Sequence, residues 1–318
     1  MKRIAVLTSG GDAPGMNAAI RAVSRTCDFN EKECLGVTRG YEGLIDGDFI
    51  PLNRAAVGGI LHKGGTMLKT ARSSRFKTEE GVQEAKQQMQ AAGIEGLVVV
   101  GGDGSFRGAK ELHDVGVPTI GVPATIDNDI AGTDETIGFD TAVNTALEAV
   151  RRLRDTASSH DRLFIVEVMG RNAGFLPLEV AVATGAEYVV VPELPLSIGN
   201  LCHKLRISHE NKKSHTLIIL AEGVMTANEM KDKLQDTGGY DARVTVLGHI
   251  QRGGSPTSFD SVLASRMGAY AAESLFVGKS GVMVGNVSGR MTLSDLERAW
   301  LEQKTLSPEL LGLIEKLN

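Results

Sequence analysis

The sequence predicts an α/β protein whose sheets are mostly parallel. Short aliphatic runs alternate with helical patterns along the 318 residues, and turns containing glycine follow most of the runs. This alternation is typical of βαβ units, in which helices cover both faces of a parallel sheet. The 38 glycines supply the tight turns, and an aromatic content of only 4% leaves the cores aliphatic. The length suffices for two similar three-layer domains that share a cleft.

The individual elements follow from local patterns. Strands are expected where aliphatic runs end at glycine, proline or a polar residue, at 3–8, 35–39, 98–100, 119–122, 164–168, 188–191, 215–220, 244–247 and 282–287. Helices are expected at 16–26, 78–92, 106–114, 141–157 and 258–277. Within 141–157, apolar residues recur at helical spacing, which predicts an amphipathic helix.

Composition excludes several classes of function. The net charge of −5 argues against a general nucleic-acid binder. Three widely spaced cysteines without a CxxC pattern argue against a disulfide framework or a zinc site and fit a reducing compartment. The first apolar run is too short for a signal peptide, and no apolar segment approaches membrane-spanning length. We therefore expect a cytoplasmic protein without a membrane partner.

A glycine turn holding one acid follows the strand at 98–100. Glycines at 101, 102 and 104 let backbone N–H groups approach a ligand, and the start of the next helix favours anions. Asp103 would repel a bare phosphate, so we expect Mg²⁺ between this acid and phosphate oxygens. The alternative is an ordinary turn in which Asp103 caps the helix. A second glycine turn, at 9–15, matches neither the GxGxxG fingerprint nor the Walker A pattern.

Polar residues fall repeatedly where predicted strands end, which is the ligand-binding edge of a parallel sheet. They are Asp103, Thr125, Asp127, Asp129, Arg171, Glu222, His249 and Arg252. Acids, cations and glycine turns are the parts that phosphoryl transfer needs. On an extended segment Asp127 and Asp129 point the same way and Asn128 the opposite way, so one acid is expected to be the base and the other to orient metal or water. The alternative is a solvated turn, since Asp-Asn-Asp is common turn chemistry.

Five blocks together resemble one family. They are Gly101-Gly102-Asp103-Gly104-Ser105, Thr125-Ile126-Asp127-Asn128-Asp129, Thr136-Ile137-Gly138-Phe139-Asp140-Thr141-Ala142, Glu167-Val168-Met169-Gly170-Arg171 and Gly248-His249-Ile250-Gln251-Arg252-Gly253-Gly254. In this order and spacing they closely resemble the bacterial ATP-dependent 6-phosphofructokinases, although Gly-Gly-Asp-Gly alone also occurs in lipid and NAD kinases. The resemblance runs from Ile4 to beyond Ala264.

The resemblance implies an enzyme that uses MgATP to phosphorylate the 1-hydroxyl of fructose 6-phosphate, with the active site between two domains. Residues 1–138 plus 251–303 would bind ATP and Mg²⁺, and residues 139–250 plus 304–318 would bind fructose 6-phosphate. It also implies a homotetramer with active and effector sites at subunit interfaces. Arg162 and Arg243 match residues that reach the 6-phosphate from a neighbouring subunit.

The resemblance also assigns roles residue by residue. Asp127 resembles the base, and Arg72 and Arg171 resemble the residues that stabilise the transferred phosphoryl group. The matching catalytic positions are Asp127, Arg171, Arg72, Thr125 and Gly11, and the matching metal positions are Asp103 and Asp129. The ATP positions are Gly11, Tyr41, Arg72, Ser73, Gly102, Asp103, Gly104 and Ser105. The sugar-phosphate positions are Thr125, Ile126, Asp127, Arg162, Met169, Gly170, Arg171, Glu222, Arg243, His249, Ile250, Gln251 and Arg252.

The sequence departs from the family at a few positions. Ala124 stands where ATP-dependent members usually have glycine, but Gly104 is intact and no lysine appears at 124, so ATP is favoured over pyrophosphate. Much of the effector set is kept: Arg21, Arg25, Arg54, Arg154, Gly185, Glu187, Lys213 and His215. Gly59 replaces a usual aspartate and Asn211 a usual cation, which predicts a weak response to ADP or phosphoenolpyruvate.

Other interpretations stay open for single residues and for the whole chain. His249 is also compatible with a strand-end cap, Glu222 with a cap on the following helix, and Arg162 and Arg243 with solvated strand starts. Two other classes of function are a lipid or NAD kinase, which shares only the Gly-Gly-Asp-Gly turn, and a non-enzymatic sugar-phosphate sensor. Intact Asp103 and Asp127 argue against the sensor.

Overall fold

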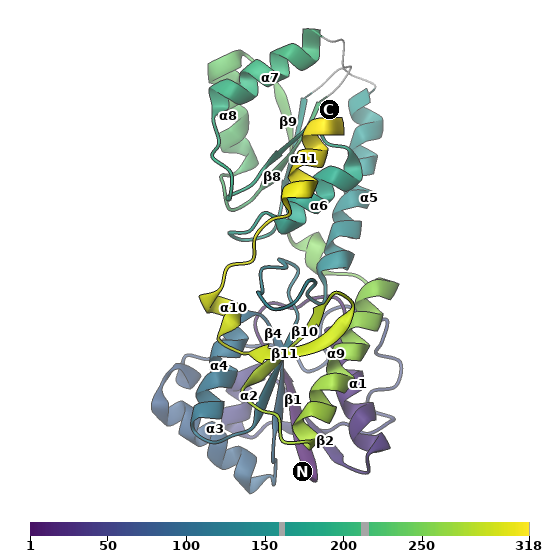
Figure 1. The fold of residues 1–318 in the computed structure, drawn as a ribbon, viewed down its shortest axis with the longest axis vertical. Helices are drawn as coiled ribbons and strands as arrows, with labels where there is room; N and C mark the ends of the chain where they lie inside the picture. The colour runs from purple at the N-terminus through teal and green to yellow at the C-terminus, as the bar shows by residue number, and fades with distance from the viewer. Residues whose placement is uncertain (159–162, 211–215, 318) are drawn as a thin grey trace. The chain divides into compact units, whose positions relative to one another are not determined.

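The computed structural model describes residues 1–158, 163–210 and 216–317 (Figure 1). The backbone packs into two compact units, each of which is assembled from separate stretches of the chain. Unit 1 comprises Met1–Ile126, Ile130–Thr141 and Arg252–Lys304, and unit 2 comprises Asp127–Asp129, Ala142–Gln251 and Thr305–Asn318. The boundaries proposed from the sequence differ from these by up to three residues, except that residues 127–129 pack with unit 2.

Each unit contains one sheet. The seven-stranded sheet of unit 1 has the order β11-β10-β5-β4-β1-β2-β3, and the four-stranded sheet of unit 2 has the order β7-β8-β6-β9. All strand pairs are parallel except β2 with β3 and β10 with β11. The strands are β1 (Arg3–Thr8), β2 (Glu33–Val37), β3 (Phe49–Pro51), β4 (Leu97–Gly101), β5 (Thr119–Pro123), β6 (Leu163–Val168), β7 (Tyr188–Val190), β8 (Thr216–Ala221), β9 (Ala242–Val246), β10 (Val282–Val287) and β11 (Arg290–Asp295). The predicted α/β class with mostly parallel sheets is confirmed.

The helices connect these strands. They are α1 (Met16–Phe29), α2 (Gly40–Asp46), α3 (Glu79–Ala91), α4 (Asp103–Asp114), α5 (Phe139–Ser158), α6 (Phe175–Thr184), α7 (Ile198–Glu210), α8 (Ala227–Gly238), α9 (Ser258–Phe276), α10 (Arg298–Leu301) and α11 (Pro308–Leu317). Two 3₁₀ turns, η1 (Arg75–Lys77) and η2 (Gly248–Arg252), lie next to predicted site residues.

The sheet of unit 1 buries both of its faces. Ala5 and Leu7 on β1 join a core cluster with side chains of α2, α3 and α4, and the alternate residues Ile4 and Val6 are buried on the opposite face. Helices α1 and α9 run side by side on that opposite face (Figure 1). Their close approach requires Gly268, because a Cβ at this position would lie 2.6 Å from the backbone oxygen of Ala19.

Unit 2 repeats the three-layer plan on a smaller scale. Helices α7 and α8 cover one face of the sheet, where Ile165, Ile218, Leu205 and Met230 belong to one core cluster. Helix α6 packs against β8, and α11 packs against α6. Helix α8 begins at a capping box in which the side chains and backbone N–H groups of Thr226 and Glu229 bond reciprocally.

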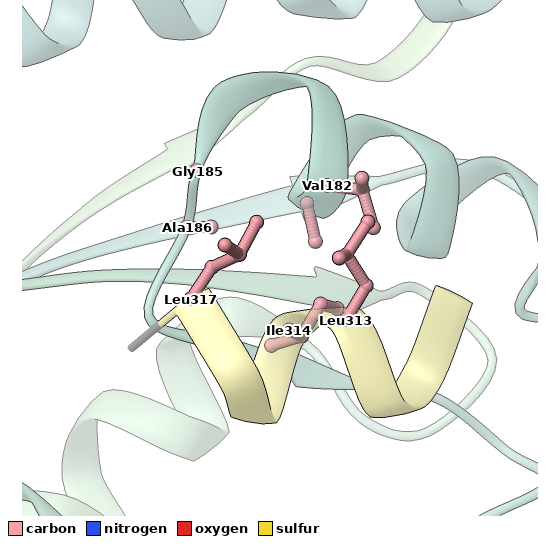
Figure 2. A pocket seen from close by; sticks show the side chains of 7 residues that line it. Val182, Gly185, Ala186, Leu313, Ile314 and Leu317 are labelled. Atoms are coloured by element: carbon pink, nitrogen blue, oxygen red, sulfur yellow. The ribbon is translucent and has the colours of Figure 1, made fainter. Parts of the chain in front are cut away.

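A small apolar hollow separates α6 from α11 (Figure 2). It encloses about 30 Å³ and is lined by Ala181, Val182, Gly185, Ala186, Leu313, Ile314 and Leu317. A space of this size has room for one small molecule such as water, but the lining side chains are aliphatic and offer it no hydrogen-bond partner. We therefore treat it as a packing gap under the C-terminal helix.

The elements expected from sequence occur in the structure with shifted ends. Strand 3–8 and strand 282–287 match β1 and β10, whereas α4 begins at Asp103, three residues before the expected start. The unexpected elements are strands β3 and β11 and helices α2, α6, α7, α8, α10 and α11. Among the described residues, no helix is long and apolar enough to cross a membrane.

Candidate active site

The turn after β4 forms the first part of the site, in unit 1. Gly102 is the N-cap of α4, so Asp103 lies in the first helical turn and is not the capping residue. A Cβ on Gly101 would lie 2.5 Å from the backbone oxygen of Ser9, and only glycine fits there. Gly104 faces open space, and the buried Ser105 hydroxyl has no hydrogen-bond partner among the described residues. The turn therefore offers exposed helix N–H groups and an unsatisfied hydroxyl to an anion.

The Tyr41 side chain supports this turn. Its ring stacks on Phe76 at a centroid distance of 4.1 Å, and its hydroxyl donates to the backbone oxygen of Ser105 at 2.5 Å. Burial raises the pKa of Tyr41 well above its ordinary value, so the phenol stays protonated and can donate. Because Tyr41 is only 6% exposed, we infer that it supports the turn that carries the predicted ATP positions.

Arg72 and Ser73 lie on the segment that leads into η1. Arg72 is exposed, and the Ser73 hydroxyl accepts a hydrogen bond from the backbone N–H of Phe76 at 3.0 Å. Arg75 holds this segment against α2 and α3 through ion pairs of 2.7 Å with Asp46 and 3.1 Å with Glu84. The Arg72 guanidinium is thus free to reach solvent while its backbone is anchored.

Gly11 and Arg252 meet in unit 1. An added Cβ on Gly11 would overlap the Arg252 guanidinium, and Nη1 of Arg252 donates to the backbone oxygen of Asp12 at 3.5 Å. Arg252 was predicted as a sugar-phosphate position, whereas the structure packs it within unit 1, the predicted ATP-binding unit. Because Gly11 has no side chain, the Arg252 guanidinium can occupy this position.

Asp127 and Arg171 are paired in unit 2. The Asp127 carboxylate is 1% exposed, and its Oδ2 lies 3.2 Å from Nε of Arg171, whose side chain is half exposed. The expectation of an extended segment is wrong, because Asn128 has a φ of 53° and residues 126–127 form a turn. A left-handed residue between the two acids removes the simple alternation that would aim them in one direction.

Glu222 and Gln251 hold the loop that carries Arg171. Oε1 of Glu222 accepts the backbone N–H groups of Gly170 at 3.4 Å and Arg171 at 3.1 Å, and Oε1 of Gln251 accepts that of Met169 at 3.3 Å. Gln251 is fully buried. The alternative in which Glu222 caps the next helix is wrong, since Thr226 caps α8. Both side chains therefore fix the loop in which Arg171 has a φ of 51°.

Other predicted sugar-phosphate positions lie elsewhere in unit 2. His249 and Ile250 are exposed on η2, and Arg243 is exposed on β9 and pairs with Asp241 at 3.5 Å. Thr125 and Ile126 follow the end of β5 in unit 1, and Ala124, directly after β5, is buried beside Ile137. Arg162 lies outside the described residues.

The predicted metal positions are Asp103, in unit 1, and Asp129, in unit 2. Among the described residues, no group of three or more His, Cys, Asp or Glu side chains could hold a metal ion. Mg²⁺ ordinarily takes one or two carboxylates and completes its shell with water and substrate phosphates. Asp103, next to the open Gly104 and the unsatisfied Ser105 hydroxyl, fits this mode of binding.

The predicted effector residues of unit 1 cluster at the C-terminal half of α1. Arg21 and Arg25 lie one turn apart, Arg25 donates to the backbone oxygen of Arg54 at 3.3 Å, and Arg54 pairs with Asp28 at 2.5 Å. The Arg25 Nε is buried and has no partner in the described part of the chain. This guanidinium retains donor capacity for an anion.

In unit 2 the predicted effector residues meet at the end of α6. Arg154 donates to the backbone oxygen of Gly185 at 2.5 Å and lies 3.8 Å from Glu187, and the buried Arg154 Nε lacks a partner among the described residues. Glu187 accepts the N–H of Leu217 at 2.8 Å. Asn211, Lys213 and His215 lie outside the described residues.

Two supporting residues had no assigned role in the sequence analysis. Thr136 donates to the backbone oxygen of Thr125 at 2.6 Å, and the fully buried Asp260 accepts hydrogen bonds from the start of α5. An acid three residues after a threonine, at the start of a predicted helix, is also what an ordinary helix start contains. No local signal therefore distinguishes Asp260 from a capping residue.

Known proteins resemble this chain over most or all of its length. A family model described as phosphofructokinase matches residues 3–275. An ATP-dependent 6-phosphofructokinase 1 of Thermus thermophilus is 53% identical over 320 residues, covering 100% of this chain and 99% of its own. The ATP-dependent 6-phosphofructokinase of Shouchella clausii is 51% identical over 318 residues, covering 100% of both chains.

A solved structure extends the likeness to the fold. The phosphofructokinase of Saccharomyces cerevisiae superposes with a TM-score of 0.88 at 36% identity and covers 100% of this chain, which spans only 47% of the yeast chain. The match of a family model over most of the chain and the high identity to full-length relatives lead to one conclusion: the chain belongs to the phosphofructokinase family.

Proposed function

We propose that this protein transfers the γ-phosphoryl group of ATP to the 1-hydroxyl of fructose 6-phosphate, giving fructose 1,6-bisphosphate and ADP in the committed step of glycolysis. The observation that carries the proposal is the buried Asp127 carboxylate paired with the half-exposed Arg171. A cation close to a carboxyl group favours its ionised form, and that is the form that can accept a proton. The full-length relatives named ATP-dependent 6-phosphofructokinase support the same reaction.

Asp127 is the general base in this proposal. The sugar 1-hydroxyl oxygen attacks the γ-phosphorus, its proton passes to Asp127, and the bond from phosphorus to the bridging oxygen of ADP breaks. Arg171 holds the carboxylate before reaction and can turn its forked donors toward the phosphoryl oxygens as charge moves there. Glu222 and Gln251 keep the backbone of the Arg171 loop fixed while the side chain moves.

The ATP phosphates bind at the turn after β4 in this proposal. The N–H groups at the start of α4 and the Ser105 hydroxyl donate to phosphate oxygens, and Arg72 supplies a further cation. Asp103 and Asp129 would hold Mg²⁺, which neutralises phosphate charge when bound. Thr125, Met169, Gly170, His249 and Arg252 are proposed to bind the sugar phosphate.

We further propose a cytoplasmic homotetramer in which Arg162 and Arg243 serve the active site of a neighbouring subunit. The exposure of Arg243 leaves its guanidinium accessible to a ligand or a second chain. Free thiols at Cys27, Cys34 and Cys202 are in keeping with a reducing compartment.

The decisive experiment is a steady-state assay of ADP release with fructose 6-phosphate as acceptor. ATP-dependent turnover with this sugar phosphate, but not with diacylglycerol or NAD, supports the proposal and separates it from the lipid and NAD kinases. Binding of fructose 6-phosphate without ADP release would instead favour a sugar-phosphate sensor. No turnover and no binding would overturn the proposal.

A further inference from the structure

Asp260 joins the starts of two helices. It lies in the first turn of α9 with no exposed surface, and its Oδ1 accepts the backbone N–H of Gly138 at 2.8 Å. Its Oδ2 accepts both the backbone N–H and the hydroxyl of Thr141, at 2.8 and 2.6 Å. The N–H groups at a helix start have no partner within the helix, so this carboxylate caps α5 from 119 residues away.

The capping is reciprocal. Thr257, the N-cap of α9, accepts the N–H of Asp260 at 3.2 Å and donates its hydroxyl to Asp140 at 2.6 Å. Its own N–H donates to the Thr141 hydroxyl at 3.0 Å. Burial raises the pKa of the Asp260 carboxyl, and the hydrogen bonds from Thr141 and Gly138 oppose that rise. Because the fully buried Asp260 carboxylate accepts hydrogen bonds from Gly138 and Thr141, it fixes the backbone geometry at the starts of both helices.

The segment just before α5 runs beside the loop that carries Asp127. The N–H of Ile137 donates to the backbone oxygen of Pro123 at 3.0 Å, and the Thr136 hydroxyl donates to that of Thr125 at 2.6 Å. Thr125 is two residues before Asp127, and Asn128 follows in the left-handed region. Such a conformation persists only where the surroundings determine it.

We propose that Asp260 is a positioning residue for Asp127, acting through Gly138, Thr136 and the backbone of Thr125. The inference rests on the proposed function for its kinetic consequence. Without the carboxylate, Gly138 and the start of α5 lose their anchor, and the segment at 136–138 no longer fixes the end of β5. The Asp127 loop then samples geometries in which the carboxylate is misplaced for proton transfer, which lowers kcat steeply.

The first test compares Asp260→Asn with Ser24→Ala. The asparagine side chain has the same shape as aspartate, but its NH₂ group is a hydrogen-bond donor. It would therefore face one of the N–H groups from which the carboxylate accepted a hydrogen bond. The serine variant is a matched control, because it removes a buried 2.8 Å hydrogen bond to Leu52 in the same unit, far from this segment in sequence. We expect kcat to fall about tenfold or more in Asp260→Asn with the KM for ATP within about twofold, and no fall in Ser24→Ala. Equal kcat values in the two variants would overturn the proposal.

The second test examines the link through Thr136. Thr136→Val removes the hydroxyl and should lower kcat, and Thr136→Ser should restore it. If Asp260 acts through this link, the losses of kcat in the two single variants should not multiply. The kcat of the double variant Asp260→Asn/Thr136→Val should then lie within about threefold of the lower of the two single-variant values. Multiplied losses would show independent effects and overturn the proposal. If Asp260→Asn does not fold, the Thr136 single variants still test the link, and an unchanged kcat in Thr136→Val would then overturn the proposal.

Hydrogen exchange of residues 124–130 without substrate separates this inference from the proposed function. We expect exchange in this loop to be about tenfold faster in Asp260→Asn and unchanged in Ser24→Ala. That result supports the positioning role even if the wild-type chain fails to phosphorylate fructose 6-phosphate. Unchanged exchange in an active wild-type enzyme would overturn the positioning role and leave the proposed function standing.

Discussion

Replacing Asp127 by asparagine removes the proposed base while keeping its shape. A positioned base contributes about 10²–10⁴ in rate, which corresponds to about 3–5 kcal/mol of transition-state stabilisation. The second effect is loss of the ion pair with Arg171, and it is small because the Arg171 side chain is 52% exposed and can be solvated. Nearly all of the loss should therefore appear in kcat, with binding of fructose 6-phosphate kept.

The assay is steady-state turnover of ATP and fructose 6-phosphate, with the dissociation constant of the sugar phosphate measured separately by calorimetry. Asp134→Asn is the matched control, because it neutralises another carboxylate of the loop between β5 and α5. Asp134 accepts the N–H of Ser288 at 2.7 Å and belongs to unit 1. We expect its kcat to stay within about threefold of wild type, since it has no part in proton transfer.

Two outcomes would refute the reasoning. A kcat of Asp127→Asn within about threefold of wild type would show that another group takes the proton. A large loss in which fructose 6-phosphate no longer binds would show that Asp127 acts mainly in binding. Melting temperatures of both variants check that the fold is intact, and a similar melting temperature with a large fall in kcat is the expected result.

Four further predictions test other parts of the site. Mixed oligomers of inactive Asp127→Asn and Arg243→Ala chains should regain activity if Arg243 serves a neighbouring subunit, and no recovery in verified hybrids would argue against a shared site. ATP should support turnover and pyrophosphate should not, because Gly104 leaves open space for the nucleotide; comparable rates with both donors would contradict this. Saturation curves for fructose 6-phosphate should change little with added phosphoenolpyruvate or ADP. The effector site lacks the usual contacts at Gly59 and Asn211, which reduces the free energy of coupling between effector and substrate sites, typically about 1–3 kcal/mol. Strong inhibition by phosphoenolpyruvate that ADP relieves would contradict this prediction. Hydrogen bonds from Thr226 lower the pKa of Glu229, so its contribution to stability is present at neutral pH and lost as the pH falls through that lowered value; the melting temperatures of Glu229→Gln and wild type should differ at pH 7 and converge in acid.

The sequence was most informative where structure is local. Aliphatic runs ending at glycine predicted β1, β4, β5 and β10 to within two residues, because a buried parallel strand needs little beyond its own composition. The same turns marked where ligands bind, since the ends of parallel strands gather at one edge of a sheet. Short antiparallel elements such as β11 were missed because the partly exposed Arg290–Asp295 has no continuous apolar run.

The contacts that shape the site were beyond sequence reasoning because they are tertiary. Asp127 and Arg171 are 44 residues apart, and nothing local predicts that Nε lies 3.2 Å from Oδ2. The left-handed φ of Asn128 breaks the extended backbone on which the expected orientation of its neighbours rested, although asparagine is among the residues that tolerate this region. Glu222 and Gln251 were expected to touch substrate, whereas their described contacts are to the Arg171 loop.

Strain and support occur together around the Asp127–Arg171 pair. Asn128 and Arg171 are both non-glycine residues with positive φ, a conformation that costs about 1–3 kcal/mol each where it is sparsely populated. Glu222 accepts the N–H of the strained Arg171, and Thr136 holds the backbone two residues before Asp127. A carboxylate and a guanidinium would pair in many geometries, because exposed arginines are long and mobile. The costly backbone restricts that freedom, so the fold spends stability on holding one geometry of an ion pair, as a site for proton transfer requires.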